Sequence, residues 1–448
     1  MDRIILLSLF SKVWLIVTGI LTIYLIGTEL TIVEQGFFYV LNSLIAIQIF
    51  FELGLNSAIV QYISHEMPKL KWSKFVLVGK LESRQIVSSI VRLVFKWYSY
   101  VALILIFIVA PLGYFTFFDS EAAMLVNADV AWLLLVVFVG FNLVISSVIS
   151  LIEGTLHVFE AVLMRFLQAF FSSVVLVVSL YSSDLGVLAL PLGSLIAVLF
   201  TAFFIIARYR RFFIDMFSLE RTKFDMSGLL SFQWKIAVSW IAGFFVYHFP
   251  IPLMMYLKNP ELSALIGMSY QIMLSITGTA IVWMTTSAAR FGSLVSSKDY
   301  ENLNALFKRQ FIRSFLFLLV TLIVFNLFFN SDFFQSTQFK YRVVSSEVFL
   351  VLSLITLATH VHLSQQIYLR AFKEEPFWKL SIVMAVTVLI LFLLLVPQYE
   401  IWGAVAAYFI GMVGVGLIYG TVVFYLFRKN RIKNGNIGKE LCLSYSQK

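Results

Sequence analysis

Residues 153–168, EGTLHVFEAVLMRFLQ, bring acidic, basic and imidazole side chains to the junction of two long apolar segments, and Arg165 falls inside the second segment. Five polar residues recur on one side of a helix with 3.6 residues per turn: His157, Arg165, Gln168, Ser172 and Ser179. A charged stripe inside hydrocarbon must face protein or water, so the pattern predicts a functional site around Arg165. The alternative interpretation is an Arg–Glu pair that only holds two helices together.

The amino-acid composition indicates what kind of helices must position this stripe. The chain of 448 residues is 60% hydrophobic and only 13% charged, whereas a soluble chain carries about 25% charged residues. Apolar runs of about 20 residues recur along the whole length, which predicts an all-α polytopic membrane protein. Cys442 is the only cysteine, so an internal disulfide and a cysteine-cluster metal site are excluded. The first apolar run lacks a small-residue cleavage site and is expected to be a retained span.

Twelve membrane-spanning helices are predicted from these runs. They lie near 9–27, 37–60, 97–117, 131–152, 157–181, 186–207, 236–257, 264–289, 311–330, 347–369, 377–397 and 401–427.

The basic residues give the orientation of these helices. Alternate connections carry most of the 33 Lys and Arg residues, whereas the connections on the other side carry only Lys258, Lys340 and Arg342. The positive-inside rule therefore predicts that both termini are cytoplasmic. The net charge of +9 is explained by this bias and does not indicate nucleic-acid binding.

A weak internal repeat divides the chain. LLSLFSK at 6–12 matches LLSFQWK at 229–235, and six spans per half keep both copies in the same orientation. We therefore expect two pseudo-symmetric six-helix lobes. The predicted parts are an N-terminal lobe at 1–207, a basic cytoplasmic linker at 208–235, a C-terminal lobe at 236–427 and a basic cytoplasmic tail at 428–448. The inner segments 61–96 and 208–235 are expected to form amphipathic helices on the membrane surface.

Other spans carry further polar side chains. Glu52 lies between Gln48 and Asn56 at four-residue steps, and it is either a functional carboxylate or one paired near the interface. Gln271 and Arg290 share a face of the eighth span, where Arg290 could instead extend to the cytoplasmic surface.

Three histidines lie in the second half of the chain. His248 precedes two prolines, which predict a bend in the seventh span. His360 and His362 point to different faces of the tenth span, which disfavours a two-histidine metal site. Each could relay protons or could simply bridge helices. Gly411, Gly414, Gly416 and Gly420 form a small-residue face of the last span, interpreted as a packing surface.

Enzymatic signatures are missing from the sequence. It contains no phosphate-binding glycine loop ending in Lys-Ser or Lys-Thr, no HExxH motif and no nucleophile elbow. We therefore expect neither an enzyme nor a cofactor or metal, and any energy would come from an ion gradient or a partner.

Four segments carry a resemblance to a known family. They are EQGFFYVLNSL (34–44), FFELGLNSAIVQYISHE (50–66), SLIEGTLHVFEAVLMRFLQ (150–168) and WMTTSAARFGSLVSSKDYENLNALFKR (283–309). With them the chain resembles the Wzx-type O-antigen and polysaccharide flippases, within the superfamily that also holds the multidrug-and-toxin extruders and the lipid II flippase.

The resemblance implies a MATE-like fold in a bacterial inner membrane. The implied cargo is an undecaprenyl-diphosphate-linked oligosaccharide, such as an O-antigen unit used in lipopolysaccharide biosynthesis, flipped from the cytoplasmic to the periplasmic leaflet by alternating access. Membrane lipids and polysaccharide polymerase or assembly proteins are the implied partners.

This cargo assigns expected roles to the polar residues. Because arginine forks match phosphate oxygens, Arg165 is expected to bind the diphosphate, aided by Lys12, Lys235 or Arg290. Gln168 and Gln271 are expected to contact the diphosphate or sugar. The predicted ion-coupling residues are Glu52, Glu153, His360 and His248.

Three other functions are weighed against the flippase. A cation-coupled multidrug exporter of the same superfamily would favour an acidic, aromatic cavity, and Arg165 argues against it. A membrane polysaccharide polymerase or ligase would carry a sizeable periplasmic loop, whereas the predicted outer loops are short. A scaffold for an envelope-sugar complex is the fourth alternative.

Overall fold

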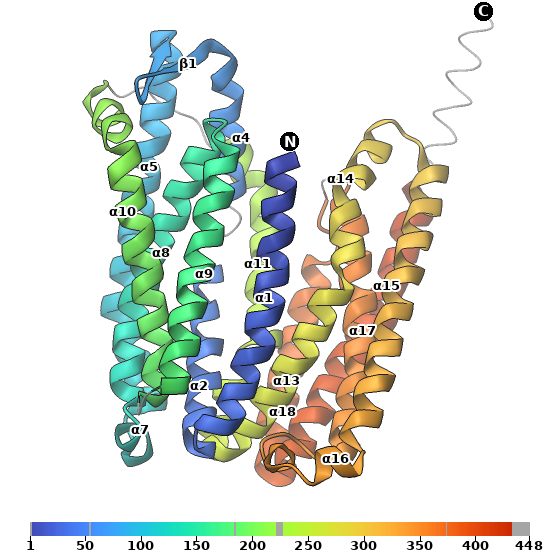
Figure 1. Cartoon of the computed structure of the whole chain (residues 1–448). Helices are drawn as coiled ribbons and strands as arrows, with labels where there is room; N and C mark the ends of the chain where they lie inside the picture. The colour runs from blue at the N-terminus through green and yellow to red at the C-terminus, as the bar shows by residue number, and fades with distance from the viewer. Residues whose placement is uncertain (1, 53–54, 183–184, 221–226, 373, 432–448) are drawn as a thin grey trace, which may run out of the picture. The chain divides into compact units, whose positions relative to one another are not determined.

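The computed structural model describes residues 2–52, 55–182, 185–220, 227–372 and 374–431. The chain divides into two compact units, Met1–Trp234 and Lys235–Lys448. Almost all of the described chain is helical (Figure 1), which confirms the predicted all-α membrane fold.

The first unit begins with α1 (Asp2–Glu29) and α2 (Ile32–Ile45), and short helical segments η1, α3 (Ile49–Glu52) and α4 (Leu55–Glu66) continue the second span. Its remaining helices are α5 (Leu81–Ile104) with its continuation η3, α6 and η4 to Phe118, α7 (Glu121–Leu125), α8 (Ala128–Gly154), α9 (Val158–Ser182) and α10 (Ala189–Ser218).

The boundary between the units falls inside α11 (Ser227–Tyr247). The second unit continues with α12 (Pro250–Leu257), α13 (Pro260–Ala280), α14 (Val282–Ser296), α15 (Tyr300–Phe329), α16 (Asp332–Gln335), α17 (Ser346–Arg370), α18 (Trp378–Phe409) and η7 (Ile410–Tyr419).

Sequence signals at the helix ends explain several of these boundaries. Thr31 and Glu34 form a reciprocal cap, in which the Glu34 backbone N–H donates to the Thr31 hydroxyl and the Thr31 N–H donates to the Glu34 carboxylate. Asn259 accepts from the Leu262 N–H at 2.9 Å, and Pro260 occupies the first turn of α13. These caps satisfy N–H groups that a helix start leaves without partners.

Within the described residues, nine helices are long and apolar enough to cross a membrane, and two bent pairs raise the number to eleven. α11 and α12 meet at 41° beside Pro250, as the two prolines predicted, and α13 and α14 meet at 43°. Each bent pair lies where the sequence predicts a single span.

The stretch from Trp378 to Arg431 is one of these nine, although its backbone reverses at Glu400, where φ is 49°. A continuous helix would place residues eight apart at about 12 Å. Gly403 instead lies against the Leu395 carbonyl, so the chain folds back on itself there. Counted as two spans, this stretch brings the number in the described chain to the predicted twelve.

The glycine face of the last span lies in this hairpin. A Cβ on Gly411 would meet Val388, one on Gly416 would meet Met384, and one on Gly420 would meet Leu380. The small residues therefore let the two arms approach closely, as interpreted from sequence. Gly414 differs, because a Cβ there would meet nothing within 4 Å.

The segment 61–96 corrects one prediction. Its ends are helical, but β1 (Leu70–Ser73) and β2 (Val76–Gly79) pair as an antiparallel hairpin between them. Lys74 and Phe75 at the turn both have positive φ, which a tight hairpin turn requires. LKWS alternates apolar and polar residues, and this strand pattern outweighs the helical pattern over these few residues.

The linker predicted at 208–235 begins inside α10, which continues to Ser218, and α11 already includes residues 227–235. Residues 221–226 of this linker lie outside the described residues, as does most of the predicted tail at 428–448, including Cys442.

Each unit has its own apolar core. In the first unit, Ile149, Ile152, Met164 and Ile205 join α8, α9 and α10. In the second unit, Met284, Phe291, Leu306, Tyr368 and Phe377 join α14, α15, α17 and the start of α18. These cores hold the helices that carry the polar side chains described next.

Candidate functional site

Arg165 and Glu153 form an ion pair in the first unit. The Arg165 Nη2 donates to the Glu153 Oε2 at 2.5 Å, which joins α9 to the end of α8. The Arg165 side chain is 44% exposed and that of Glu153 is 24% exposed. Arg165 belongs to the apolar span Val158–Tyr181. Because a guanidinium does not face hydrocarbon, its exposed part must face water or lipid head groups.

Gln168 lies one turn further along α9. Its side-chain amide donates to the side-chain oxygen Oδ1 of Asn142 on α8. Both side chains are half-buried, so the pair can still present polar atoms to a solvent-facing surface. The sequence singled out Gln168 and missed Asn142, because the partner lies on another helix at a separation of 26 residues.

Lys12 is exposed on α1, which packs along α9 (Figure 1). The rings of Phe10 and Phe166 have centroids 5.4 Å apart, and those of Trp14 and Phe170 are 4.6 Å apart. The two helices therefore run in the same direction. Lys12 lies two residues from each of these ring contacts, so it is on the opposite face of α1 from α9. Lys12 forms no ion pair within the described chain.

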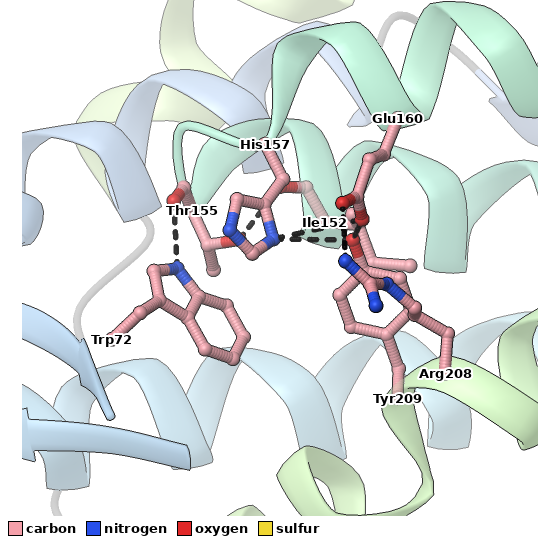
Figure 2. Close-up of polar contacts among 7 residues, drawn as sticks. All are labelled: Trp72, Ile152, Thr155, His157, Glu160, Arg208 and Tyr209. Carbon is pink, nitrogen blue, oxygen red and sulfur yellow. Dashed lines mark hydrogen bonds and ion pairs between the residues drawn. The ribbon is translucent and has the colours of Figure 1, made fainter. Parts of the chain in front are cut away.

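His157 belongs to a different cluster, formed where the hairpin, the α8–α9 turn and α10 meet (Figure 2). Its ring stacks on Trp72 with centroids 4.5 Å apart and planes 14° apart. The Trp72 indole N–H donates to the Thr155 carbonyl at 3.1 Å. His157 Nδ1 lies 3.1 Å from the Tyr209 hydroxyl. The β-hairpin thus holds the turn through one indole ring.

Glu160 accepts from two residues of α10. The Tyr209 hydroxyl donates to one carboxylate oxygen, and Arg208 donates to the other at 3.1 Å (Figure 2). Since the Tyr209 proton is used for Glu160, His157 Nδ1 carries the hydrogen in its contact with Tyr209. The guanidinium of Arg208 also lies 5.0 Å from the ring centroid of Phe75, which ties it to the hairpin.

The electrostatics of this cluster favour neutral imidazole. Burial lowers the pKa of the His157 imidazole, the Glu160 carboxylate raises that pKa in part, and Arg208 lowers it again. The first effect is the largest, so His157 is less readily protonated than a free histidine.

The proposed five-residue stripe is therefore wrong at its first member. His157 precedes α9, which begins at Val158, and its ring contacts Trp72 and Tyr209, whereas Arg165 pairs with Glu153. Leu156 in the turn has φ of 68°, so the helical period does not extend across it.

Glu52 ends α3 and is half-buried in the first unit. Asn56, four residues on, accepts from the Tyr98 hydroxyl at 3.3 Å. Glu52 forms no ion pair with any of the described residues. Glu52 therefore does not pair with Lys12 in the described part of the chain.

The two predicted histidines of the second unit have apolar surroundings. His360 is buried, and its Nε2 lies 2.6 Å from the Ser314 hydroxyl, which donates to the Ala280 carbonyl at 2.6 Å. His248 is half-buried at the break between α11 and α12, stacked on Phe244. His362 stacks on Phe377, so it and His360 do point to different sides of α17.

The remaining predicted residues also lie in the second unit. Lys235 is exposed on α11, Gln271 is half-buried on α13, and Arg290 is exposed near the end of α14. The predicted residues thus occur in both units, and their expected roles stay predictions.

One buried charged group escaped the sequence reasoning. Glu375 precedes α18, and its side chain is 1% exposed. It accepts from Arg370 at 2.6 Å, Gln366 at 3.1 Å and Ser239 at 3.3 Å. Nothing in the sequence separates Glu375 from its neighbour Glu374. The searched part of the chain holds no group of three His, Cys, Asp or Glu side chains suited to a metal ion.

No protein-family model matches the chain. No curated protein is a significant match either.

Solved structures, in contrast, share the fold. An inward-facing multidrug resistance transporter of the MATE family, in the MOP superfamily, has a TM-score of 0.66 with 15% identity over 94% of this chain and 95% of that chain. The lipid II flippase MurJ in an inward closed conformation has a TM-score of 0.64, again with 15% identity, over 97% and 92% of the two chains.

A MOP-superfamily transporter from Pyrococcus furiosus, described as having a binding pocket of reverse polarity, has a TM-score of 0.60 with 15% identity over 97% and 94%. The chain therefore has the fold of MOP-superfamily transporters. At identities of this size the comparisons show a shared fold alone. The function must be argued from the residues.

Proposed function

We propose that this protein is a transporter that moves an undecaprenyl-diphosphate-linked oligosaccharide from the cytoplasmic to the periplasmic leaflet of a bacterial inner membrane by alternating access. The observation that carries the proposal is the Arg165 guanidinium, nearly half exposed within an apolar span. A cation held within an apolar span suits an anionic cargo that must cross the membrane. MurJ, which has the same fold, is described as a lipid II flippase.

The ion pair with Glu153 suggests how cargo binds. A diphosphate presents oxygens that match the guanidinium fork, so it replaces the carboxylate on Arg165. Glu153 is then released from its cationic partner. We propose that this exchange links cargo binding to the ion-coupling role of Glu153.

Neighbouring side chains extend this site in the first unit. Exposed Lys12 on the neighbouring helix α1 is proposed as a second cation for the cargo, and the Gln168–Asn142 pair supplies amide groups suited to sugar hydroxyls. In the second unit, Lys235, Arg290 and Gln271 are proposed to contact the same head group in a later state of the cycle. His360 and His248 are proposed as secondary proton-binding groups. The N- and C-termini of the chain are proposed to lie on the cytoplasmic side.

A second candidate is a cation-coupled multidrug exporter, as the MATE-family neighbour is described. Two observations favour it. Glu52 is a half-buried carboxylate with no ion pair among the described residues, and the rings of Trp14, Phe166 and Phe170 cluster between α1 and α9. Carboxylates and aromatic faces attract organic cations.

A deletion strain separates the two candidates. Loss of a flippase should abolish surface polysaccharide and leave its undecaprenyl-diphosphate-linked precursor to accumulate, with unchanged sensitivity to organic cations. Intact surface polysaccharide together with increased sensitivity to cationic drugs would overturn the flippase proposal and support the exporter.

A further inference from the structure

A basic cavity lies between α14 and α15 in the second unit. Its volume is about 440 Å³. Its lining consists of two arginines, one amide and three aliphatic side chains: Arg290, Arg309, Asn302, Leu294, Ala305 and Leu306. No acidic residue lines it, and neither arginine forms an ion pair within the part of the chain that is described. Two guanidinium groups facing one cavity provide the geometry that phosphate oxygens require.

Asn302 is fixed by the cap of α15. Its side-chain amide donates to the Asp299 carboxylate at 2.8 Å, and its backbone N–H donates to the other carboxylate oxygen at 3.2 Å. The Asp299 carboxylate is therefore engaged by the helix end. The two arginines are left to set the charge of the cavity.

The face of α15 that follows Arg309 toward the C-terminal end of the helix indicates the kind of ligand. Four aliphatic residues follow Arg309 and Arg313 at helical spacing on the same face, and all four are exposed: Leu316, Val320, Ile323 and Leu327. A continuous exposed aliphatic strip in a membrane helix faces acyl chains, not water. The site thus offers a cationic end and an apolar continuation, as an anionic lipid requires.

We propose that this cavity binds the phosphate head group of an anionic phospholipid, with its acyl chain along the exposed strip of α15. Basic pockets between membrane helices at the cytoplasmic surface bind such head groups. The lipid-linked cargo is a poorer occupant, because the cavity offers aliphatic side chains and an already engaged amide where a sugar would need hydrogen-bonding partners. Arg290 is shared with the contact proposed for the cargo head group, so competition between the two lipids distinguishes the two occupants.

The test compares two double variants of the full-length protein in detergent. Arg290→Gln/Arg309→Gln removes both cations from the cavity. Lys298→Gln/Lys308→Gln removes the same charge from exposed positions of the same helical hairpin that do not line it. Binding of phosphatidylglycerol and phosphatidylcholine is measured by native mass spectrometry, with undecaprenyl diphosphate as a competitor.

The cavity variant should bind phosphatidylglycerol roughly thirtyfold more weakly than the wild type, because two phosphate contacts are lost. The control variant should keep wild-type affinity, and phosphatidylcholine should bind weakly to all three. Equal phosphatidylglycerol affinities in the two variants would overturn the proposal.

A lysine variant and competition between lipids provide two further tests of the phospholipid site. Arg290→Lys/Arg309→Lys keeps the charge and should fold if the glutamine variant does not, and it should lose only a fewfold in affinity because the bidentate geometry is gone. Preferential binding of undecaprenyl diphosphate over phosphatidylglycerol at this cavity would assign it to the cargo and contradict the phospholipid assignment.

Discussion

Arg165 on α9 and Glu153 on α8 are joined by a nitrogen–oxygen distance of 2.5 Å, with both side chains partly exposed. This geometry is compatible with a functional site at Arg165 and with an ion pair that only holds α8 and α9 together. Variants that remove the Arg165 charge and variants that remove only its pairing with Glu153 distinguish the two roles.

The pair itself should add little stability. A partly exposed ion pair contributes about 0–1 kcal/mol, so Glu153→Gln/Arg165→Gln should be produced at nearly the wild-type level. If Arg165 binds phosphate, Arg165→Gln and the double variant should both lose transport by roughly tenfold or more, measured as surface polysaccharide in a complemented deletion strain. Glu153→Gln should retain phosphate binding. Full activity in the double variant would reduce the pair to a structural contact.

His157 should make stability depend on pH. Burial holds its pKa below the ordinary value of about 6.5, so the unfolded chain binds more protons near that pH. The contribution to stability is therefore complete above about pH 6.5 and is lost as the pH falls through the lowered folded-state value. Thermal unfolding at pH 7.5 and 5.5 checks this.

Wild-type protein should lose more thermal stability on acidification than His157→Asn. His65→Asn serves as the control, since that histidine is exposed at the end of α4. An identical pH response in wild type and His157→Asn would contradict the role of the imidazole stacked on Trp72.

The adjacent residues Glu374 and Glu375 should behave differently. The Glu375 side chain is 1% exposed and accepts from Arg370, whereas Glu374 pairs with Arg431 and is 44% exposed. Glu375→Ala leaves its donors without an acceptor and should cost about 2–4 kcal/mol. Glu374→Ala should cost less than about 1 kcal/mol. Chemical unfolding in detergent measures both, and equal effects would argue against the buried network.

Two glycines of η7 provide a packing test. A Cβ at Gly411 would collide with Val388, whereas one at Gly414 would meet nothing within 4 Å. Gly411→Ala should therefore destabilise the protein by about 1–3 kcal/mol through overpacking. Gly414→Ala should be neutral or stabilising by up to about 1 kcal/mol. Comparable losses in both variants would contradict the close packing of the α18–η7 hairpin.

Much of the fold was accessible from the sequence because bilayer thickness fixes the length of an apolar run. The predicted span 131–152 lies within α8, and 347–369 lies within α17. The β-hairpin at 70–79 was missed because its two strands are only four residues long each, too short for an alternating pattern to stand out from a helical one.

The candidate site was less accessible, because side-chain partners depend on how helices are rotated about their axes. Arg165 and Glu153 could be singled out as charges in apolar surroundings. The stacking of His157 on Trp72 could not be, because it joins a turn to a hairpin 85 residues earlier in the chain. Likewise, only tertiary packing decides that Glu375 is buried while Glu374 is exposed.

Transport by purified protein tests the central claim most directly. The full-length chain is reconstituted into liposomes with undecaprenyl-diphosphate-linked N-acetylglucosamine that carries a fluorescent label on the sugar, and an external quencher reports transfer between leaflets. Wild-type protein should accelerate transfer, Arg165→Gln should reduce that acceleration by at least roughly tenfold, and Arg165→Lys should retain part of it. Equal rates in protein-free and wild-type liposomes, or in the wild type and Arg165→Gln, would contradict the account.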